Sequence, residues 1–236
     1  MTDNQLTSGI ALAIFGTTLT LFSHFILQII PLTALGIATI ILGTTIAITS
    51  PHPLPKETIQ LLINNTIQNI EALLEEFTTI EKAIYIPKED KTYAYIPLNP
   101  AEIDTNQIKR APNRLIIKIE EHYGLQLIPP GTELIKTLNL ETLEEVNIED
   151  TLRTILVDLT DLAEGVKTIF KDNTAIIEIN GIKLEIDAPR YIEILGSLQA
   201  SITAATIAAV LKKPVKILEE KPERRKTTIK IQILGE

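Results

Sequence analysis

The hydrophobic pattern of the chain changes once, after about the first fifty residues. Residues 4–55 contain no Asp, Glu, Lys or Arg, and two apolar runs, 6–30 and 32–49, meet at Pro31. Each run is close to the roughly 20 residues that a helix needs to cross a bilayer. A helix also satisfies its own backbone hydrogen bonds, as hydrocarbon requires. The pattern therefore predicts a transmembrane helical hairpin over residues 1–50.

The two apolar runs repeat each other at a distance of 27 positions. Gly9 and Gly16 recur as Gly36 and Gly43 (36 − 9 = 43 − 16 = 27), in matching Gly-Ile-Ala and Gly-Thr-Thr triplets. Glycines seven residues apart lie on nearly one helical face and allow a second helix to approach closely. We expect these four glycines to form the packing surface of the hairpin. Frequent use of Gly in membrane helices is the alternative explanation.

A secretory signal peptide is the alternative interpretation of the first run. Such a peptide has a basic start, a 7–15-residue apolar core and a cleavage site. The first eight residues contain Asp3 and no Lys or Arg, and the apolar run is much longer. We therefore expect a retained anchor in the cell membrane. The turn has no basic residue whereas Lys56 follows the second run, so the positive-inside rule favours a cytoplasmic domain.

Beyond the hairpin the pattern is that of a soluble α+β domain. Prolines in residues 51–56 predict a stiff linker, and residues 57–236 form the expected soluble domain. Apolar positions three and four apart predict a helix over 56–80, which includes Leu62 on its apolar face. Strand pairs are expected at 83–87 with 92–97 and at 114–120 with 125–128. Residues 99–113 are expected to be an irregular loop, and 133–138 a short helix.

The C-terminal part predicts an αββ-αββ unit over residues 148–234. A helix at 148–164 precedes a hairpin of strands 166–170 and 175–179, and the alternation at 182–186 predicts an edge strand. An apolar helix over 191–211 carries Gly196 and several alanines, which suit flat packing on a sheet. Strands 215–218 and 228–234 form the last hairpin, with 219–226 as its loop. The predicted fold class is α+β, built from helices and antiparallel hairpins.

Short structural motifs give the chain a resemblance to known proteins. They are Pro129-Pro130-Gly131, Asp187-Ala188-Pro189, Gly196-Ser197, Ala204-Ala205 and Lys213-Pro214-Val215. The chain resembles a family of uncharacterised archaeal membrane proteins that begin with a two-helix hairpin, and this resemblance implies no functional residue. The C-terminal order of elements is also similar to the vinyl-reductase/TRAPP-like domains, which bind small hydrophobic ligands or partner proteins. Their C-terminal cysteine and aspartate motif is absent here.

Composition narrows the function classes further. The net charge of −8 argues against nucleic acid as a partner and against broad docking on anionic lipid. The chain has no Cys, which excludes disulfides, thiolate chemistry and Cys-based metal sites. Heavy use of Ile, Glu and Lys fits a heat-adapted organism, whereas plentiful Asn and Gln point the other way.

No motif predicts catalysis, a cofactor or a metal. His24, His52 and His122 lack ligand spacing, and nucleotide-binding, zinc-protease and hydrolase signatures do not occur. Glu178, Glu185 and Asp187 alternate with apolar residues, which indicates the solvated face of strands. We expect a protein that is not an enzyme.

One dense basic group remains, made of Lys221, Arg224, Arg225 and Lys226. On the predicted loop these side chains suit lipid headgroups or an acidic partner, although hairpin loops are polar in any case. The favoured hypothesis is a membrane-anchored, non-catalytic domain for protein–protein interaction, scaffolding or self-association. The alternative is a membrane-tethered sensor that binds a small apolar ligand in the αββ-αββ unit.

Overall fold

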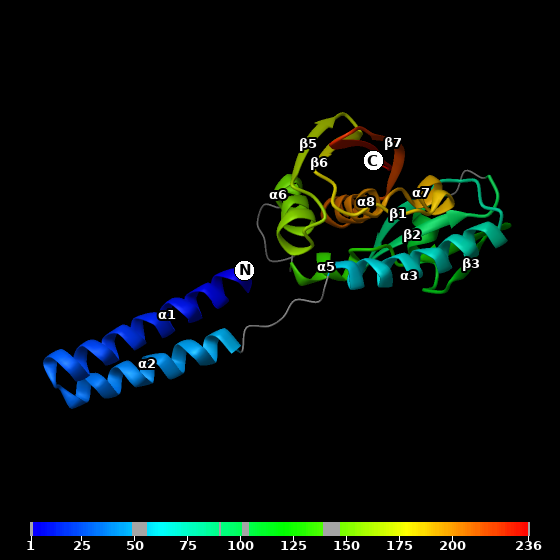
Figure 1. Cartoon of the computed structure of the whole chain (residues 1–236). Coiled ribbons are helices and arrows are strands. Elements are labelled where there is room, and N and C mark those ends of the chain that lie inside the picture. Colours follow the sequence, from blue (N-terminus) through cyan, green and yellow to red (C-terminus); the bar gives the residue numbers. More distant parts are fainter. Residues whose placement is uncertain (1, 49–55, 90, 101–103, 139–146, 236) are drawn as a thin grey trace. The chain divides into compact units, whose positions relative to one another are not determined.

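The chain divides into two compact units, Met1–Ile59 and Gln60–Glu236 (Figure 1). The computed structural model describes residues 2–48, 56–89, 91–100, 104–138 and 147–235. Most of the predicted linker, residues 51–56, therefore lies outside the described residues. The first unit contains the apolar helices and the second contains a sheet, so the predicted α+β class with an N-terminal helical pair is confirmed.

The first unit is a helical hairpin. Helix α1 (Thr2–Phe22) continues as a π-helical turn, η1 (Ser23–Leu27), and α2 (Ile30–Ile48) returns beside it. The chain reverses at Gln28, which has φ 53°. Pro31, the predicted break, instead lies in the first turn of α2, where a missing N–H costs nothing. The Ser23 hydroxyl fastens the turn by donating to the Ile29 carbonyl at 3.0 Å.

The second unit is built on one eight-stranded antiparallel sheet. Its strand order is β3-β4-β2-β1-β7-β8-β6-β5. The bounds are β1 (Ile84–Lys88), β2 (Lys91–Pro97), β3 (Ile116–Ile119), β4 (His122–Leu127), β5 (Gly165–Lys171), β6 (Thr174–Asn180), β7 (Val215–Pro222) and β8 (Lys226–Ile233). The pair β1–β7 joins the N-terminal four strands to the C-terminal four.

Helices cover mainly one face of the sheet. They are α3 (Lys56–Glu76), α4 (Thr105–Arg110), α5 (Thr132–Thr137), α6 (Ile148–Arg153) with its π-helical continuation η3 (Thr154–Leu159), α7 (Pro189–Leu195) and α8 (Leu198–Leu211). In Figure 1 the sheet curves around α8, with β1 and β2 on one side of the helix and β5, β6 and β7 on another. Helix α8 is therefore the centre of the main core.

Strand alternation divides the buried side chains between two cores. In β1 and β2, Tyr85 and Ala94 face α8, whereas Ile86 and Tyr95 face the opposite side with Ile108 of α4. On the α8 side, residues 198–208 are all buried. Its alanines allow the helix to lie close to the strands, as the apolar helix predicted at 191–211 required.

Two predicted boundaries in the C-terminal unit are wrong. The single helix over 191–211 is two helices, because Gly196 adopts φ 78° and Ser197 accepts a bond from the Ala200 N–H at 3.2 Å. The long loop predicted at 219–226 is mostly strand, since β7 reaches Pro222 and β8 begins at Lys226. Only residues 223–225 connect the two strands.

Three other expectations need correction. Residues 182–186 form no strand; the Lys183 N–H donates to the Leu162 carbonyl at 3.0 Å, outside the sheet. Residues 99–113 contain α4, which Asp104 caps by accepting from the Asn106 N–H at 2.9 Å. The helix predicted over 56–80 ends at Glu76, and Leu62 on it is 62% exposed instead of buried.

Helix α3 is tied to α7 by a carboxylate. Glu71 accepts hydrogen bonds from the backbone N–H groups of Arg190 at 2.9 Å and Tyr191 at 2.5 Å. Amides in the first turn of a helix have no partner within the helix, so a carboxylate there acts as a cap. This bond fixes the start of α7 and, through it, the Gly196 turn that leads into α8.

We expect Glu71→Ala to lower the free energy of unfolding of the sheet unit by about 1–2 kcal/mol, because two amides lose a charged acceptor. Denaturant unfolding of the full chain measures the change. Glu75→Ala, on the exposed side of the same helix, is the matched control and should change stability by less than about 0.5 kcal/mol. Equal effects of the two substitutions would show that the cap contributes little.

Candidate functional site

The four glycines of the hairpin lie where α1 and α2 make their closest approach. A Cβ atom on Gly9 would lie 2.7 Å from the Ala47 backbone N, and one on Gly43 would lie 2.5 Å from the Ala13 backbone N. Gly16 meets the Ile40 backbone in the same way. No side chain fits at such distances, so the helix contact requires glycine at these positions.

The hairpin contacts follow the 27-residue repeat. The contact of Gly9 with Ala47 corresponds to that of Gly36 with Thr20, because each helix position is matched 27 residues away. The two helices are therefore related by approximate twofold symmetry. Ser23 is buried and continues the seven-residue spacing of Gly9 and Gly16. Ser23 was not predicted, because only glycines were considered, although it lies seven residues after Gly16.

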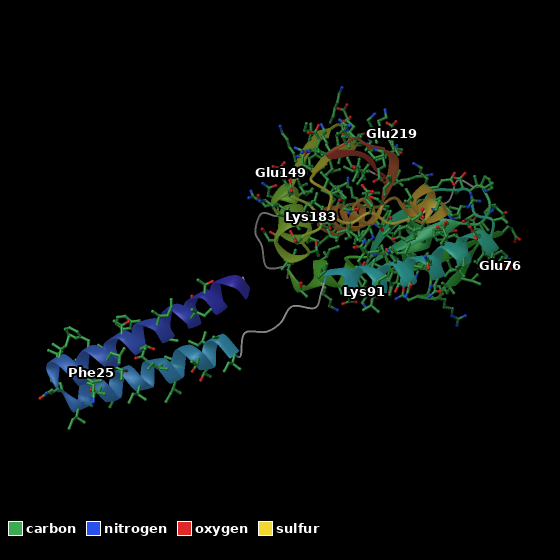
Figure 2. All side chains as sticks on the ribbon, viewed as in Figure 1. Phe25, Glu76, Lys91, Glu149, Lys183 and Glu219 are labelled. Atoms are coloured by element: carbon green, nitrogen blue, oxygen red, sulfur yellow. The ribbon has the colours of Figure 1, made fainter. Side chains whose placement is uncertain are left out.

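The outer surface of the hairpin is apolar. Phe15, Phe22 and Phe25 are exposed, and Figure 2 shows Phe25 beside the turn. Both Thr7–Leu27 and Ile30–Ile48 are long and apolar enough to span a membrane. A third stretch, Pro189–Leu211, also has that length and hydropathy, but 78% of its apolar 18-residue window is buried in the sheet unit. It is therefore the core helix pair α7–α8.

We expect Gly43→Leu to separate α1 from α2, because the added side chain meets backbone, at a cost of about 1–3 kcal/mol. Ala13, although small, lies in the contact, so the matched control is Ala11→Leu on the exposed side of α1. Fluorescence energy transfer between dyes on Ser8→Cys and Ile48→Cys, in detergent titrated with dodecyl sulfate, reports the separation. Equal midpoints for the two leucine variants would contradict close packing as the reason for glycine.

Two of the four basic residues at the last hairpin form ion pairs, and the other two are exposed in the turn. Lys226 pairs with Glu178 at 2.7 Å and Lys221 with Glu219 at 2.8 Å. These hydrogen bonds raise the pKa of each lysine and lower the pKa of each carboxyl group. Arg224 and Arg225 occupy the turn, where both are exposed. The predicted basic group therefore presents two guanidinium groups instead of four free cations.

The other polar residues considered from the sequence do not converge. His24 packs edge-on against Phe25 near the hairpin turn, His122 lies in β4, and His52 is outside the described residues. Glu178 is paired with Lys226, apart from the segment that carries Glu185 and Asp187. Within the described ranges, no three His, Asp or Glu residues are arranged to hold a metal ion.

A hydroxyl cluster lies beside α8. The Tyr85 hydroxyl donates to the Leu195 carbonyl at 2.5 Å and lies 2.9 Å from the Ser201 hydroxyl. The Tyr191 hydroxyl is buried near the same Ser201 hydroxyl, and the Thr203 hydroxyl is buried in α8 without a hydrogen-bond partner among the described residues. Burial raises the pKa of Tyr191 to about 12 and that of Tyr85 well above its ordinary value. Both phenols are thus neutral at physiological pH.

The opposite face of the sheet buries Lys88, the last residue of β1 and one residue beyond the strand predicted at 83–87. The Lys88 Nζ donates to the Gln126 Oε1 at 2.6 Å and to the Ala111 carbonyl at 3.1 Å, and lies 5.4 Å from the Tyr93 ring centre. Burial lowers the pKa of this amine. In the described part of the chain it has no carboxylate at ion-pair distance. Neutral oxygen acceptors thus satisfy the ammonium locally.

The two edge strands of the sheet differ in how they are covered. At β5, the Glu149 carboxylate, which Figure 2 shows on α6, accepts the Thr168 N–H at 2.7 Å. At β3 the exposed side chains are Ile116, at 45%, and Lys118, with Leu115 (49%) just before the strand and Tyr123 (48%) on β4. The β5 edge also exposes Ile169 and Phe170, at 47% and 46%, so the edges differ in the capping carboxylate. Exposed apolar residues along an open strand edge are typical of a surface that pairs with another chain.

The protein therefore combines a hairpin whose two helices are long and apolar enough to span a membrane with an antiparallel sheet unit. Residues 7–233 match the family described as Domain of unknown function (DUF7982), and the chain belongs to that family. No curated protein and no solved structure matches the chain. The archaeal source and the likeness to vinyl-reductase/TRAPP-like domains stay predictions.

Proposed function

We propose that the protein is a membrane-anchored, non-catalytic domain for protein–protein interaction or scaffolding. The apolar, exposed edge at β3 is the observation that carries this proposal. A surface of this kind, on a domain attached to a membrane hairpin, recruits or organises other chains next to the bilayer. The lipid bilayer and a protein are thus its proposed partners, with no role for nucleic acid.

The interior next to α8 supports the same proposal. Ala200, Ala204, Ala205 and Ala208 are fully buried within one cluster that also holds strand residues such as Ile177. Helix and sheet are packed against each other along this face, so side chains occupy the region where a sensor would hold an apolar ligand.

One observation favours the alternative, a membrane-tethered sensor. The Thr203 hydroxyl of α8 is buried without a hydrogen-bond partner among the described residues. A small ligand with a polar group would satisfy it, since an unpaired buried polar atom costs free energy. Solvent extraction of the purified protein, followed by mass spectrometry, tests this function directly.

We expect the full chain, isolated from native membranes in mild detergent, to retain a protein partner, either a different chain or a second copy of itself. Leu115→Ser combined with Tyr123→Ser should remove that partner, because both side chains line the β3 edge. Ile169→Ser, on the exposed side of β5, is the matched control and should retain it. A monomeric chain with no bound protein and a stoichiometric extracted lipid would contradict the interaction proposal and favour the sensor.

We further propose that the sheet unit is cytoplasmic. The single Lys56 after the second apolar run supports this orientation, because basic residues stay on the cytoplasmic side. Protease added to intact cells should leave the sheet unit whole and should cleave it only after permeabilisation. Cleavage in intact cells would reverse the orientation without altering the hairpin.

A further inference from the structure

The open edge of β3 has a definite set of free backbone groups. The Gln126 N–H donates to the Leu115 carbonyl at 2.8 Å, and Ile117 and Ile119 lie opposite Gly124 and His122 of β4. In an antiparallel pair, alternate residues direct both N–H and C=O to the same neighbour. Odd-numbered residues of β3 therefore bond to β4. The N–H and C=O groups of Ile116 and Lys118 point away from the sheet.

Opposite charges flank β3. From 114 to 120 the sequence is Arg-Leu-Ile-Ile-Lys-Ile-Glu; Arg114 precedes the strand, and Glu120 begins the turn that follows it, with φ 53°. Arg114 is exposed and has no ion pair within the described part of the chain. Glu120 accepts from the Gln107 Nε2 at 2.7 Å through one carboxylate oxygen, so its other oxygen is available to a second cation.

We propose that β3 pairs antiparallel with β3 of a second copy of this chain, with Ile117 at the twofold axis. This inference rests on the proposed interaction function and names its partner. Ile116 of each copy then bonds to Lys118 of the other through both N–H and C=O groups. The two sheets become one continuous sheet, and Arg114 of each copy lies near Glu120 of the other.

Charge selects this register over its neighbours. Outward groups occur only at even positions, so antiparallel pairing about the edge has three nearby registers. With Ile116 opposite itself, Lys118 faces Arg114 of the second copy; with Lys118 opposite itself, two lysines meet. Like charges directly opposite each other destabilise a strand pair. Of these three registers, the one centred on Ile117 brings Arg114 of each copy next to Glu120 of the other.

The pairing also covers the exposed apolar surface. Leu115 of one copy meets Ile119 of the other on the α4 side of the sheet, and Ile116 meets the aliphatic stem of Lys118 on the α8 side. The ammonium of Lys118 already lies 5.7 Å from the Tyr123 ring centre, which holds the stem along the sheet. Tethering both copies to one membrane raises their effective concentration, which favours a short interface of this kind.

Thiol crosslinking of the full chain in liposomes tests the proposal. The chain has no native cysteine, so Ile117→Cys supplies a single thiol. Residues at a non-hydrogen-bonded antiparallel position have Cα atoms about 4.5 Å apart, within disulfide range. We expect mild oxidation to produce a disulfide-linked dimer. Ile169→Cys on the β5 edge, the positional control, should remain monomeric.

Charge exchange then tests the register. Arg114→Glu should slow dimer crosslinking about tenfold, since two attractive pairs become repulsive. Glu120→Arg should have the same effect, and the combined exchange should return the rate to within about threefold of the parent. Arg110→Glu, which makes the same charge change on α4, should leave the rate unchanged. No rescue by the combined exchange would overturn the register.

The oligomeric mass of the same charge variants, made without any cysteine, gives a readout that does not require a substitution of Ile117. A dimer that Arg114→Glu converts to monomer supports the inference. A monomeric parent that retains a different protein, lost in Leu115→Ser with Tyr123→Ser, overturns the self-pairing and leaves the interaction function standing. A monomeric parent with no protein partner overturns both, and crosslinking at Ile169 would assign the interface to β5 instead.

Discussion

The packing of α8 against the curved sheet is the contact on which the rest of the sheet unit depends. Strands from both halves of the sheet contribute to the cluster around this helix, among them Tyr85 of β1 and Ile217 of β7. The direct pairing between β1 and β7 involves only two residue pairs. Burial of α8 therefore holds the two halves together more than the strand ladder between them does, because burying many apolar side chains stabilises more than a few backbone hydrogen bonds do.

An open sheet around one helix leaves two strand edges, and this protein treats them differently. Glu149 from α6 occupies an edge amide of β5, which removes a donor that another strand would need. At β3 the corresponding amides of Ile116 and Lys118 face outward, next to exposed apolar side chains. Natural proteins protect edges that must not pair. The difference gives a physical reason to assign interaction to β3.

The sequence predicted most of the elements, because unbroken apolar runs mark the two N-terminal helices and apolar alternation marks the strand hairpins. The prediction failed where contacts with residues elsewhere in the fold determine the backbone conformation. Gly196 ends α7 because the turn there brings the Ser197 N–H to Glu220 at 2.9 Å, a contact between residues far apart in sequence. Residues 182–186 alternate like a strand, yet no neighbouring strand edge receives them. The sequence located the basic group at the last hairpin. It did not show that Glu178 of β6 pairs with Lys226 and that Glu219 of β7 pairs with Lys221.

The candidate site was harder to predict than the fold. Leu115, Ile116 and Tyr123 look like ordinary strand residues in the sequence, and only the strand order shows that β3 is an edge. Glycine spacing in the hairpin was a local signal, which is why it could be read without coordinates. An edge is a property of the whole sheet, so no local pattern identifies it.

Amide hydrogen exchange at the two sheet edges, measured on the full chain in liposomes, tests the central claim most directly. If β3 pairs with a second copy, the N–H groups of Ile116 and Lys118 exchange slowly, as in the interior of a sheet, and become fast in the Arg114→Glu variant. If both amides exchange at the rate of solvent-exposed groups in the parent chain, β3 is an open edge and its pairing with a second copy is wrong.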